Sequence, residues 1–472
     1  MFYSGREILE TTGGTLIRGN ADTVFEAVST DTRESQAGRL FIPLKGERFD
    51  GHSFIAAAVE KGATGLLIKE GEEGRLREIT GNVTVIRVPD TLSALGAVAC
   101  SWRKKFYIPV VAITGSAGKT TTKEMAACIM GLIKKVLKTE GNLNNLVGLP
   151  LTMLKIRNEH EIAILEMGTN QPGEIARLSR IASPDVGLIA NIGPAHLEGL
   201  KSVDMVREEK GELFRNLSES GIAIVNNDDD AVRTLAKRRQ GRKVTYGVAA
   251  DVDVMAENIA DIPTGVNFVL RIGADRDKVS MATVGFHNVM NALAAAAISW
   301  ALGTDPKTIR RGLQAYNPVP SRMEILTLKN GSFLIDDTYN ANPLSVRQAL
   351  ISLKNLKKSY NSVVILGDML ELGTRAEELH EEVGGFLATT GVATIFLKGE
   401  LSRVTAAGAK KKGFPAERIF FPSTGEEIVG HLSRLLEKGD WVLVKGSRAM
   451  RMEEIVKSIV ETFGLRGEHP RE

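Results

Sequence analysis

The chain has 472 residues, which corresponds to roughly two to four domains at about 100–200 residues each. It is 43% hydrophobic and 25% charged, so it can bury substantial cores, and disordered, collagen-like and fibrous classes are excluded. The 60 basic and 57 acidic residues leave a net charge of +3. That balance is not the signature of a nucleic-acid-binding or membrane-surface protein.

Two cysteines, Cys100 and Cys128, do not suggest a disulfide framework and fit a reducing compartment. The first residues lack a basic segment followed by an apolar one, and no run of about 18 apolar residues occurs. We therefore expect a cytoplasmic protein with neither a membrane nor a nucleic acid as partner.

The first block of predicted elements covers residues 1–108 and mixes short strands with helices. Strands are predicted at 40–44, 64–68 and 83–88, and helices at 54–61 and 91–105. Pro109 then breaks the pattern. This block predicts a small α/β N-terminal domain.

The second block, residues 109–317, alternates apolar strands with helices. The strands are predicted at 110–113, 162–165, 186–192 and 222–225, and the last two helices at 288–302 and 306–316. The segment Asn317-Pro318-Val319-Pro320 reads as a linker. Such apolar runs are typical of a mostly parallel sheet that is covered on both faces.

The third block, residues 318–472, alternates more regularly. Its strands are predicted at 333–335, 363–366, 394–397, 419–421 and 441–444, with helices between them. This pattern predicts a Rossmann-like, doubly wound sheet. The fold class is therefore α/β with three domains.

The sharpest motif follows the strand that opens the second block. It reads Gly115-Ser116-Ala117-Gly118-Lys119-Thr120-Thr121 and precedes a predicted helix. Backbone N–H groups of such a loop cradle phosphates, with Lys119 on the β/γ-phosphates and the Thr120 hydroxyl on Mg²⁺. A longer loop would need glycine where Ile113 stands. The motif predicts a central P-loop ATPase-like domain. A GTPase switch protein is excluded, because no Asn-Lys-x-Asp segment follows.

Polar residues follow the next strands, where ligands of parallel sheets bind. Glu166 suits a Mg²⁺ ligand, although it could equally cap a loop. His196 ends the segment that begins at Asn191, and a lone loop histidine is usually a surface residue. The pattern alone leaves both alternatives open.

Lys210 stands out because it falls on the apolar stripe of a helix that Ser202 can cap. Val206, Leu213 and Phe214 share that stripe at spacings of three and four. A lysine there either snorkels to solvent or has a lowered pKa. A neutral amine can react with CO₂ to give a carbamate, which is an anionic metal ligand.

Together these motifs resemble the Mur ligases of peptidoglycan synthesis across essentially the whole chain. The resemblance rests on residues 112–121, 166–168, 191–198 and 210–212. It implies ATP as substrate, two Mg²⁺ ions and a carbamate on Lys210. Thr120 and Glu166 would contact one ion, and His196 and carbamylated Lys210 the other. It also favours a carbamate on Lys210 over a lysine side chain that snorkels to solvent.

The resemblance implies further nucleotide contacts. The segment Gly285–Asn291 matches the family's G-x-H-N-x-x-N element, with Asn288 and Asn291 as ATP-binding residues. His287 and Asn291 share a helix face, and Asn288 points elsewhere, but Asn288 lies near the helix start, where side chains can reach a ligand. Helix capping is the alternative. Arg322 would reach the γ-phosphate. Asp337 would contact the ribose, although Asp336 is adjacent.

Substrate contacts are predicted in two places. In the first domain, Thr32, Arg33 and Lys45 are expected to hold a UDP-sugar, with plain surface charge as the alternative. Asparagines are the candidates for the peptide, because amides hydrogen-bond peptide groups. They are Asn142, Asn144, Asn145, Asn340 and Asn342.

Segments 141–145, 337–343, 367–373 and 445–448 resemble one late member of the family. That resemblance implies ATP-dependent joining of D-alanyl-D-alanine to UDP-muramoyl-tripeptide through an acyl phosphate. It also implies a monomer and closure of the third domain over ATP. The third tripeptide residue, diaminopimelate or lysine, stays open.

Two rivals remain at this point. A folylpolyglutamate synthetase-like ligase lacks the separate first domain. A non-catalytic nucleotide-binding scaffold has no need of the intact set Lys119, Glu166, His196 and Lys210.

Overall fold

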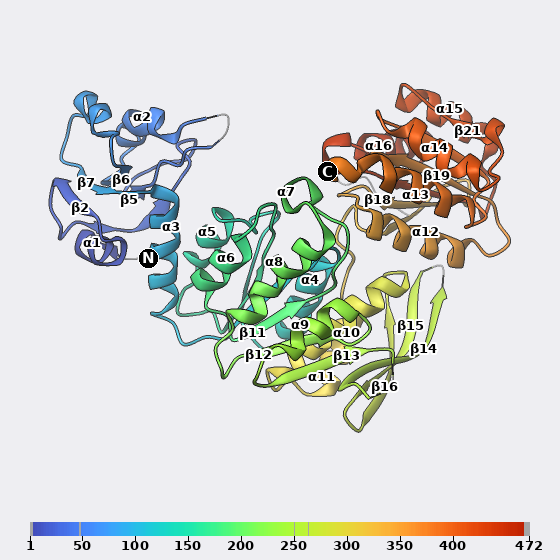
Figure 1. Cartoon of the computed structure of the whole chain (residues 1–472), viewed down its shortest axis with the longest axis horizontal. Coiled ribbons are helices and arrows are strands. Elements are labelled where there is room, and N and C mark those ends of the chain that lie inside the picture. The colour runs from blue at the N-terminus through green and yellow to red at the C-terminus, as the bar shows by residue number, and fades with distance from the viewer. Residues whose placement is uncertain (1–2, 47–48, 250, 263, 467–472) are drawn as a thin grey trace.

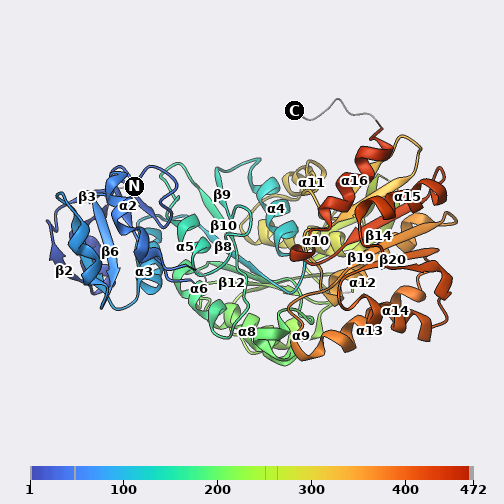
Figure 2. The ribbon, with the colours of Figure 1, turned by 90° about the horizontal axis from the view of Figure 1, so that it is seen from above.

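The computed structural model describes residues 3–46, 49–249, 251–262 and 264–466. Three large sheets follow one another along the chain (Figure 1). Figure 2 shows the N-terminal elements at one end, the C-terminal elements at the other and the central sheet between them. This arrangement confirms the predicted α/β class with three sheets.

The N-terminal part is a small α/β unit. Its five-stranded sheet has the order β2 (Thr15–Arg18), β7 (Thr84–Val88), β6 (Gly65–Lys69), β5 (Arg39–Phe41), β4 (Ala27–Ser29). Only the β2–β7 pair in it is antiparallel. A two-stranded ribbon, β1 (Tyr3–Ser4) with β3 (Val24–Phe25), lies beside it. The helices are α1 (Gly5–Thr12), η1 (Gly51–Phe54), α2 (Ile55–Glu60), η2 (Glu73–Glu78) and α3 (Thr91–Arg103).

The central sheet has nine strands in the order β16-β15-β14-β13-β12-β11-β8-β10-β9. Its parallel part consists of β8 (Val110–Thr114), β9 (Val136–Lys138), β10 (Ile162–Glu166), β11 (Val186–Ile189), β12 (Ile222–Asn226) and β13 (Lys243–Gly247), to which β14 (Val254–Ile262) adds. The predicted 186–192 strand ends at Ile189, because Asn191 turns to the phosphate loop. The Asn191 carbonyl accepts from Ser116 N at 3.1 Å.

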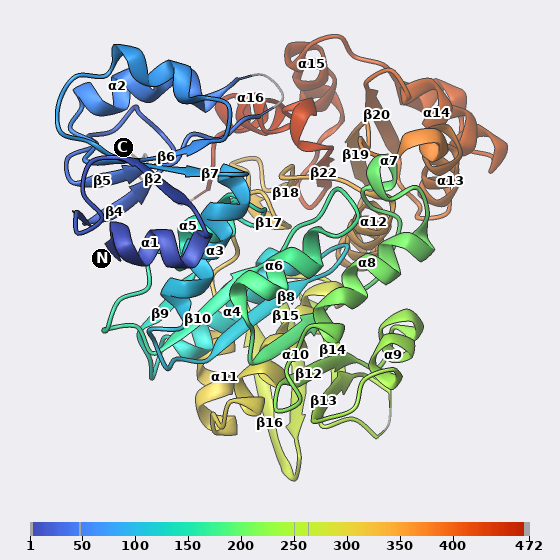
Figure 3. The ribbon, with the colours of Figure 1, turned by 60° about the vertical axis from the view of Figure 1, so that its left-hand side comes forward.

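Helices cover both faces of the parallel part. Alternate residues of β8 explain why: Val111 and Ile113 belong to one apolar cluster, whereas Val110 and Ala112 belong to the other. The first face carries α4 (Lys119–Met130), α10 (Phe286–Ala301) and α11 (Pro306–Gln314). The second carries α6 (Glu174–Ala182), α8 (Val203–Arg215) and α9 (Asp230–Lys237). Figure 3 shows α6 and α8 side by side. Short helices α5 (Gly148–Met153) and α7 (Leu197–Leu200) complete this part.

The edge of the central sheet differs from the prediction of alternating strands and helices. Strands β14, β15 (Gly265–Ile272) and β16 (Asp275–Met281) form an antiparallel meander. Gly273, with a left-handed φ of +57°, lies in the turn between β15 and β16. Buried and more exposed residues alternate along β14 and β15. The meander therefore lacks the continuous apolar runs that indicated the other strands.

The C-terminal sheet is doubly wound, with strand order β17-β18-β22-β19-β20-β21. The strands are β17 (Glu324–Thr327), β18 (Phe333–Asp337), β19 (Ser362–Gly367), β20 (Thr394–Lys398), β21 (Ile419–Phe420) and β22 (Trp441–Lys445), and only β17–β18 pair antiparallel. Helices α12 (Pro343–Lys357), α13 (Ala376–Ala388) and α14 (Ser402–Lys411) pack on one face. Helices α15 (Gly425–Leu435) and α16 (Glu453–Phe463) pack on the other. Short helices are η3 (Gly373–Arg375), η4 (Ala416–Arg418) and η5 (Arg448–Met450).

One apolar cluster joins the central and C-terminal parts. Leu197 and Leu200 of α7 share it with Met369 and Leu372, which follow β19. All four side chains are buried. The two parts are therefore packed together beside the cleft between them. None of the helices within the described ranges is long and apolar enough to cross a membrane.

Candidate active site

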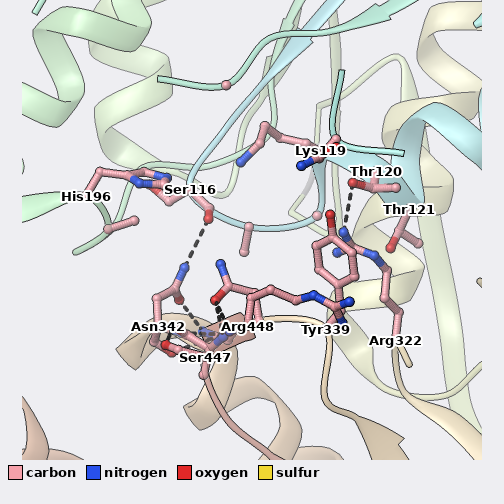
Figure 4. A pocket seen from close by; sticks show the side chains of 18 of the residues that line it. Ser116, Lys119, Thr120, Thr121, His196, Arg322, Tyr339, Asn342, Ser447 and Arg448 are labelled. Carbon is pink, nitrogen blue, oxygen red and sulfur yellow. Dashed lines mark hydrogen bonds between the residues drawn. The ribbon is translucent and has the colours of Figure 1, made fainter. Parts of the chain in front are cut away.

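A cleft of about 590 Å³ lies between the central and C-terminal parts. Residues from the phosphate loop and from the loops after β18 and β22 face one another across it (Figure 4). The sequence-predicted residues that line it are Ser116, Ala117, Gly118, Lys119, Thr120, Thr121, Asn142, Asn144, Asn145, Glu166, His196, Asn288, Asn291, Arg322, Asp337, Asn340 and Asn342. Residues that are up to 226 positions apart in sequence therefore share one cavity.

The phosphate loop joins the buried strand β8 to α4, which begins at Lys119. Gly118 has a left-handed φ of +80°, and a Cβ there would collide with the Asn291 amide. Lys119 Nζ donates to the carbonyl of Gly115 at 2.8 Å. Burial lowers the pKa of Lys119, with Glu166 opposing that shift and Arg322 adding to it.

Neighbouring loops fix the shape of the phosphate loop. Asn191 Oδ1 accepts from Ala117 N at 2.9 Å, and its Nδ2 donates to the Ala117 carbonyl at 3.1 Å. Ser116 Oγ donates to the Gly193 carbonyl at 3.0 Å. From the C-terminal part, Asn342 Nδ2 donates to the Ser116 carbonyl at 3.1 Å. The loop is thus held from both sides of the cleft.

The hydroxyl of Thr120, in the first turn of α4, lies beside the carboxylate of Glu166, which ends β10. Thr120 Oγ1 donates to Glu166 Oε2 at 2.8 Å, and Asn144 Nδ2 donates to Glu166 Oε1 at 2.8 Å. Glu166 is only 3% exposed, and its backbone N–H donates to Thr139 Oγ1 at 2.9 Å. A hydroxyl and a carboxylate at the phosphate loop are the donors that Mg²⁺ takes beside phosphate oxygens. These residues therefore fit a Mg²⁺ ion.

The protein donors are few, however. Among the residues that the structure describes, no group of three or more His, Cys, Asp and Glu side chains could hold a metal ion. Mg²⁺ in phosphoryl-transfer sites uses one or two carboxylates and completes its shell with waters and substrate phosphates. The small number of protein donors is typical of such a site, and not of a structural metal site whose coordination positions are all filled by protein side chains.

Lys210 lies on α8, whose N-cap Ser202 accepts from Met205 N at 3.2 Å. Its side chain is 0% exposed, so it does not snorkel, and its buried Nζ has no hydrogen-bond partner among the residues that the structure describes. Burial holds the pKa of Lys210 well below its usual range, and the charge of Lys119 lowers it further. Lys210 is not in the cleft lining. The predicted buried position is confirmed, whereas the carbamate stays a prediction.

His196 immediately precedes α7 and has a left-handed φ of +56°. Its Nδ1 lies 2.8 Å from Glu371 Oε2 of the C-terminal part. Burial lowers the pKa of His196, and the hydrogen bond from His196 lowers the pKa of Glu371. His196 is therefore a cross-domain contact rather than an ordinary surface histidine.

Asn288 reaches the cleft from the start of α10, as its place near the helix start predicted. Asn291 Nδ2 donates to Asn288 Oδ1 at 3.1 Å, and both residues line the cleft with His287. Asn288 lies in the first turn, where its Nδ2 reaches back to Thr283 Oγ1 at 2.9 Å. Burial lowers the pKa of His287 to about 4, and nearby Lys445 contributes.

Asp337 lines the cleft, whereas Asp336 does not. Lys445 Nζ donates to Asp337 Oδ2 at 2.5 Å. Asp336 is buried and accepts from Ser321 Oγ at 3.0 Å and from Thr338 Oγ1 at 2.6 Å. Desolvation raises the pKa of Asp336. The geometry thus favours Asp337 over its neighbour as the residue open to a ligand.

Arg322 reaches from the C-terminal part to the phosphate loop. Its Nη2 donates to Thr120 Oγ1 at 3.0 Å. The guanidinium also lies over the Tyr339 ring, with Cζ 3.9 Å from the ring centroid. A cation is therefore positioned beside the hydroxyl that the loop motif assigns to Mg²⁺ and phosphate.

The sequence matches three family models in order along the chain. These are "Mur ligase family, catalytic domain" over residues 24–129, "Mur ligase middle domain" over 113–299 and "Mur ligase, glutamate ligase domain" over 321–448. The UDP-N-acetylmuramoyl-tripeptide--D-alanyl-D-alanine ligase of Bacillus subtilis is 36% identical, with 97% of this chain and 98% of that protein covered. The chain belongs to the Mur ligase family.

Other Mur ligases are similar to this chain over nearly its full length. The ligase of the same name from Escherichia coli is 37% identical, with 93% of this chain and 95% of that protein covered. The crystal structure of MurF from Acinetobacter baumannii has a TM-score of 0.88 at 32% identity, covering 98% and 99%. MurF ligase from Thermotoga maritima in complex with ADP has a TM-score of 0.82 at 28% identity, covering 93% and 97%.

The asparagine side chains of this Mur ligase cleft already form some hydrogen bonds within the protein. Asn145 Oδ1 accepts from Gly148 N at 2.8 Å, and Asn342 caps α12 by accepting from Ser345 N at 2.8 Å. Asn340 Oδ1 accepts from Arg448 N at 3.3 Å. Asn142 lines the cleft as well. Their remaining donors and acceptors are what a peptide could use.

The three residues predicted to hold a UDP-sugar do not line the cleft. The Arg33 side chain is 88% exposed, and its Nε donates to Asp31 Oδ2 at 2.9 Å. The carbonyl of Thr32 accepts from Lys61 Nζ at 2.6 Å. Lys45 is exposed. These residues belong to a separate surface of the N-terminal part.

Several cleft residues were not predicted as site residues, chiefly Tyr339, Gln348, Glu371, Lys445 and Arg448, although all but Gln348 lie in segments that carry the family resemblance. A usable signal existed for some of them. Lys445 ends β22 directly beside the end of β18, since it pairs with Asp337, and Glu371 follows the end of the adjacent β19. The rule about carboxyl ends of parallel strands, applied to the third block, indicates both.

Proposed function

We propose that this Mur ligase joins D-alanyl-D-alanine to the terminal carboxylate of UDP-N-acetylmuramoyl-tripeptide, giving ADP, phosphate and UDP-MurNAc-pentapeptide. The curated relatives named for that reaction support it, since two of them match over 93–97% of this chain. The observation that carries it is the Arg322–Thr120 hydrogen bond of 3.0 Å, which brings a C-terminal cation onto the phosphate loop. The folylpolyglutamate synthetase-like rival is disfavoured by the five-stranded N-terminal sheet and these full-length matches.

The reaction follows from the cleft in two steps. The tripeptide carboxylate attacks the γ-phosphorus of ATP, the bond to ADP breaks, and an acyl phosphate forms. The amine of D-alanyl-D-alanine then attacks the acyl carbon, loses a proton, and phosphate leaves. Lys119 and Arg322 stabilise the charge that develops on the transferred group, and the walls of the cleft align the reactants. No protein nucleophile takes part.

The ATP contacts extend from the loop to the ribose. The loop from Gly115 to Thr121 surrounds the phosphates. The N–H groups of Ser116 and Ala117 already donate to Asn191, so the donors to phosphate are the N–H groups at the start of α4, which Gly118 precedes. Asn288 and Asn291 face the nucleotide from α10. Asp337 receives the ribose.

Thr120 and Glu166 would hold one Mg²⁺ ion, and His196 and carbamylated Lys210 would contact a second. Mg²⁺ there neutralises charge on the β- and γ-phosphates. The Lys210 amine supports the carbamate because it is buried, has no partner and has a lowered pKa. A new N–C bond to CO₂ forms with loss of one proton, and the buried group becomes an anion.

We assign one task to each domain. Residues 1–108 bind the UDP-sugar through Thr32, Arg33 and Lys45, residues 109–317 bind ATP, and residues 318–472 close over it. The five cleft asparagines receive the peptide substrates. The enzyme works as a cytoplasmic monomer.

Phosphate release tests the reaction. With UDP-MurNAc-tripeptide, ATP and D-alanyl-D-alanine together, we expect one phosphate per pentapeptide, and none when any substrate is omitted. Tripeptides ending in diaminopimelate and in lysine are compared in parallel. A scaffold releases none with either. Release with a folate and glutamate instead would support the rival ligase.

A further inference from the structure

Glu371 is a carboxylate in the cleft to which the proposed reaction gives no task. It stands in the loop after β19 of the C-terminal part. Its Oε2 lies 2.8 Å from Nδ1 of His196, and its main-chain carbonyl accepts from Glu198 N at 3.0 Å. One residue thus contacts residues 196–198 through both its side chain and its backbone.

The backbone on both sides of this contact is unusual. His196 and Glu371 have left-handed φ values of +56° and +63°. Non-glycine residues adopt this conformation uncommonly, and it persists only where the surroundings hold it. The two loops are therefore shaped so that the two side chains meet.

The Glu371 loop is built into the C-terminal part. Met369 N donates to His380 Nε2 at 3.0 Å, and His380 Nδ1 donates to the Ala376 carbonyl at 2.7 Å. Leu370 N donates to Ser447 Oγ at 2.8 Å. Met369 and Leu372 on either side are also buried, so the backbone that carries Glu371 is anchored in the C-terminal part.

The contact between Glu371 and His196 determines which ring nitrogen of His196 carries the hydrogen. A carboxylate oxygen accepts, so His196 Nδ1 must carry the hydrogen, and Nε2 keeps its lone pair. A histidine that ligates a metal ion through one nitrogen usually donates from the other to a carboxylate or carbonyl, which sets its tautomer and ring orientation. Glu371 supplies that acceptor from the opposite side of the cleft.

We propose that Glu371 is a positioning residue that holds His196 with Nδ1 protonated and Nε2 free for Mg²⁺, and only while the C-terminal domain is closed. This inference rests on the proposed metal role of His196. It makes the metal site complete only when the domain that carries Arg322 and Asp337 is in place. Metal binding and domain closure then favour each other.

The test uses the full chain with three variants and one matched control. Glu371→Ala removes the acceptor, Glu371→Gln keeps an acceptor without the charge, and His196→Ala defines the histidine signal and the histidine-dependent metal affinity. Glu378→Ala is the control. Glu378 follows Glu371 closely in sequence and lies outside the cleft lining, and its Oε1 accepts a hydrogen bond from Arg375 Nη2 at 2.8 Å. Matching unfolding midpoints establish that all four variants fold.

Two readouts are measured. In ¹⁵N-histidine spectra recorded without metal but with a non-hydrolysable ATP analogue and UDP-MurNAc-tripeptide bound, wild type, Glu371→Gln and Glu378→Ala should show His196 with hydrogen on Nδ1, whereas Glu371→Ala should shift toward the Nε2–H form. Mn²⁺ affinity, followed by electron paramagnetic resonance with a non-hydrolysable ATP analogue and UDP-MurNAc-tripeptide, should fall about 10–100-fold in Glu371→Ala. It should stay near wild type in Glu371→Gln and in the control.

Three results overturn the proposal. An unchanged tautomer and affinity in Glu371→Ala would show that Glu371 does not position His196. Equal loss of affinity in Glu371→Gln and Glu371→Ala would show that the carboxylate binds the metal ion directly. Wild-type affinity in His196→Ala would remove both this inference and the proposed metal role of His196, while phosphate release would still test the ligase reaction separately.

Discussion

The cleft and the N-terminal surface differ in how far their polar side chains are already engaged. In the cleft, Glu166 accepts two hydrogen bonds, and Arg322 bonds across the domain boundary. On the N-terminal surface, Arg33 is 88% exposed and contacts only its near neighbour Asp31. The side chains of the cleft are therefore held in place before any ligand binds, whereas we expect the proposed UDP-sugar contacts of the N-terminal surface to form when the substrate arrives.

The largest effect is expected for Lys210→Ala. Ligase activity should fall about 10²–10³-fold, because the proposed carbamate, an anion that would contact the second Mg²⁺, would be lost. Short carboxylates such as formate or acetate should partly restore the rate, since they can occupy the space of the carbamate. Steady-state phosphate release measures both.

Lys201→Ala is the matched control for that experiment. Lys201 is exposed and precedes α8, so its removal should leave the rate near wild type. Full activity in Lys210→Ala would show that Lys210 has no role in the reaction. It would also weaken the distinction between the cleft and the N-terminal surface.

The stability of the cleft should depend on pH through the same lysine. The folded-state pKa of Lys210 is lowered, so the unfolded chain binds more protons between that value and about 10.4. In CO₂-free buffer, wild-type stability should therefore rise with pH relative to Lys210→Met, by up to about 1.4 kcal/mol per pH unit. Urea unfolding at several pH values checks this slope, and parallel curves for the two proteins would contradict it.

The smallest effect is expected for Arg33→Ala. Because its ion pair is exposed, the unfolding free energy should stay close to that of wild type. KM for UDP-MurNAc-tripeptide should rise several-fold with kcat unchanged, since Arg33 binds ground and transition states alike. Arg6→Ala, another exposed arginine paired with an aspartate, is the control and should change neither. A fall in kcat alone would mean that the two regions are less distinct than proposed.

Sequence reasoning worked where a residue's surroundings are local. The apolar runs of β8, β10 and β12 indicated strands buried on both faces, and the helical spacing placed Lys210 in the interior. The β14–β16 meander escaped because alternating strands resemble surface segments.

Contacts across the domain boundary could not be predicted in the same way. The Glu371–His196 and Asn342–Ser116 pairs join loops 175 and 226 positions apart. They depend on how two separately built sheets are oriented, which no periodicity encodes. Ser116, His196 and Asn342 were predicted individually, whereas Glu371 and both pairings were not.

The most direct test of the central claim follows an oxygen atom. UDP-MurNAc-tripeptide labelled with ¹⁸O in its terminal carboxylate is turned over with ATP and D-alanyl-D-alanine, and the released phosphate is analysed by mass spectrometry. The acyl-phosphate reaction predicts one ¹⁸O atom in each phosphate, because the attacking oxygen leaves with the phosphorus. Phosphate without label, released together with pentapeptide, would contradict it.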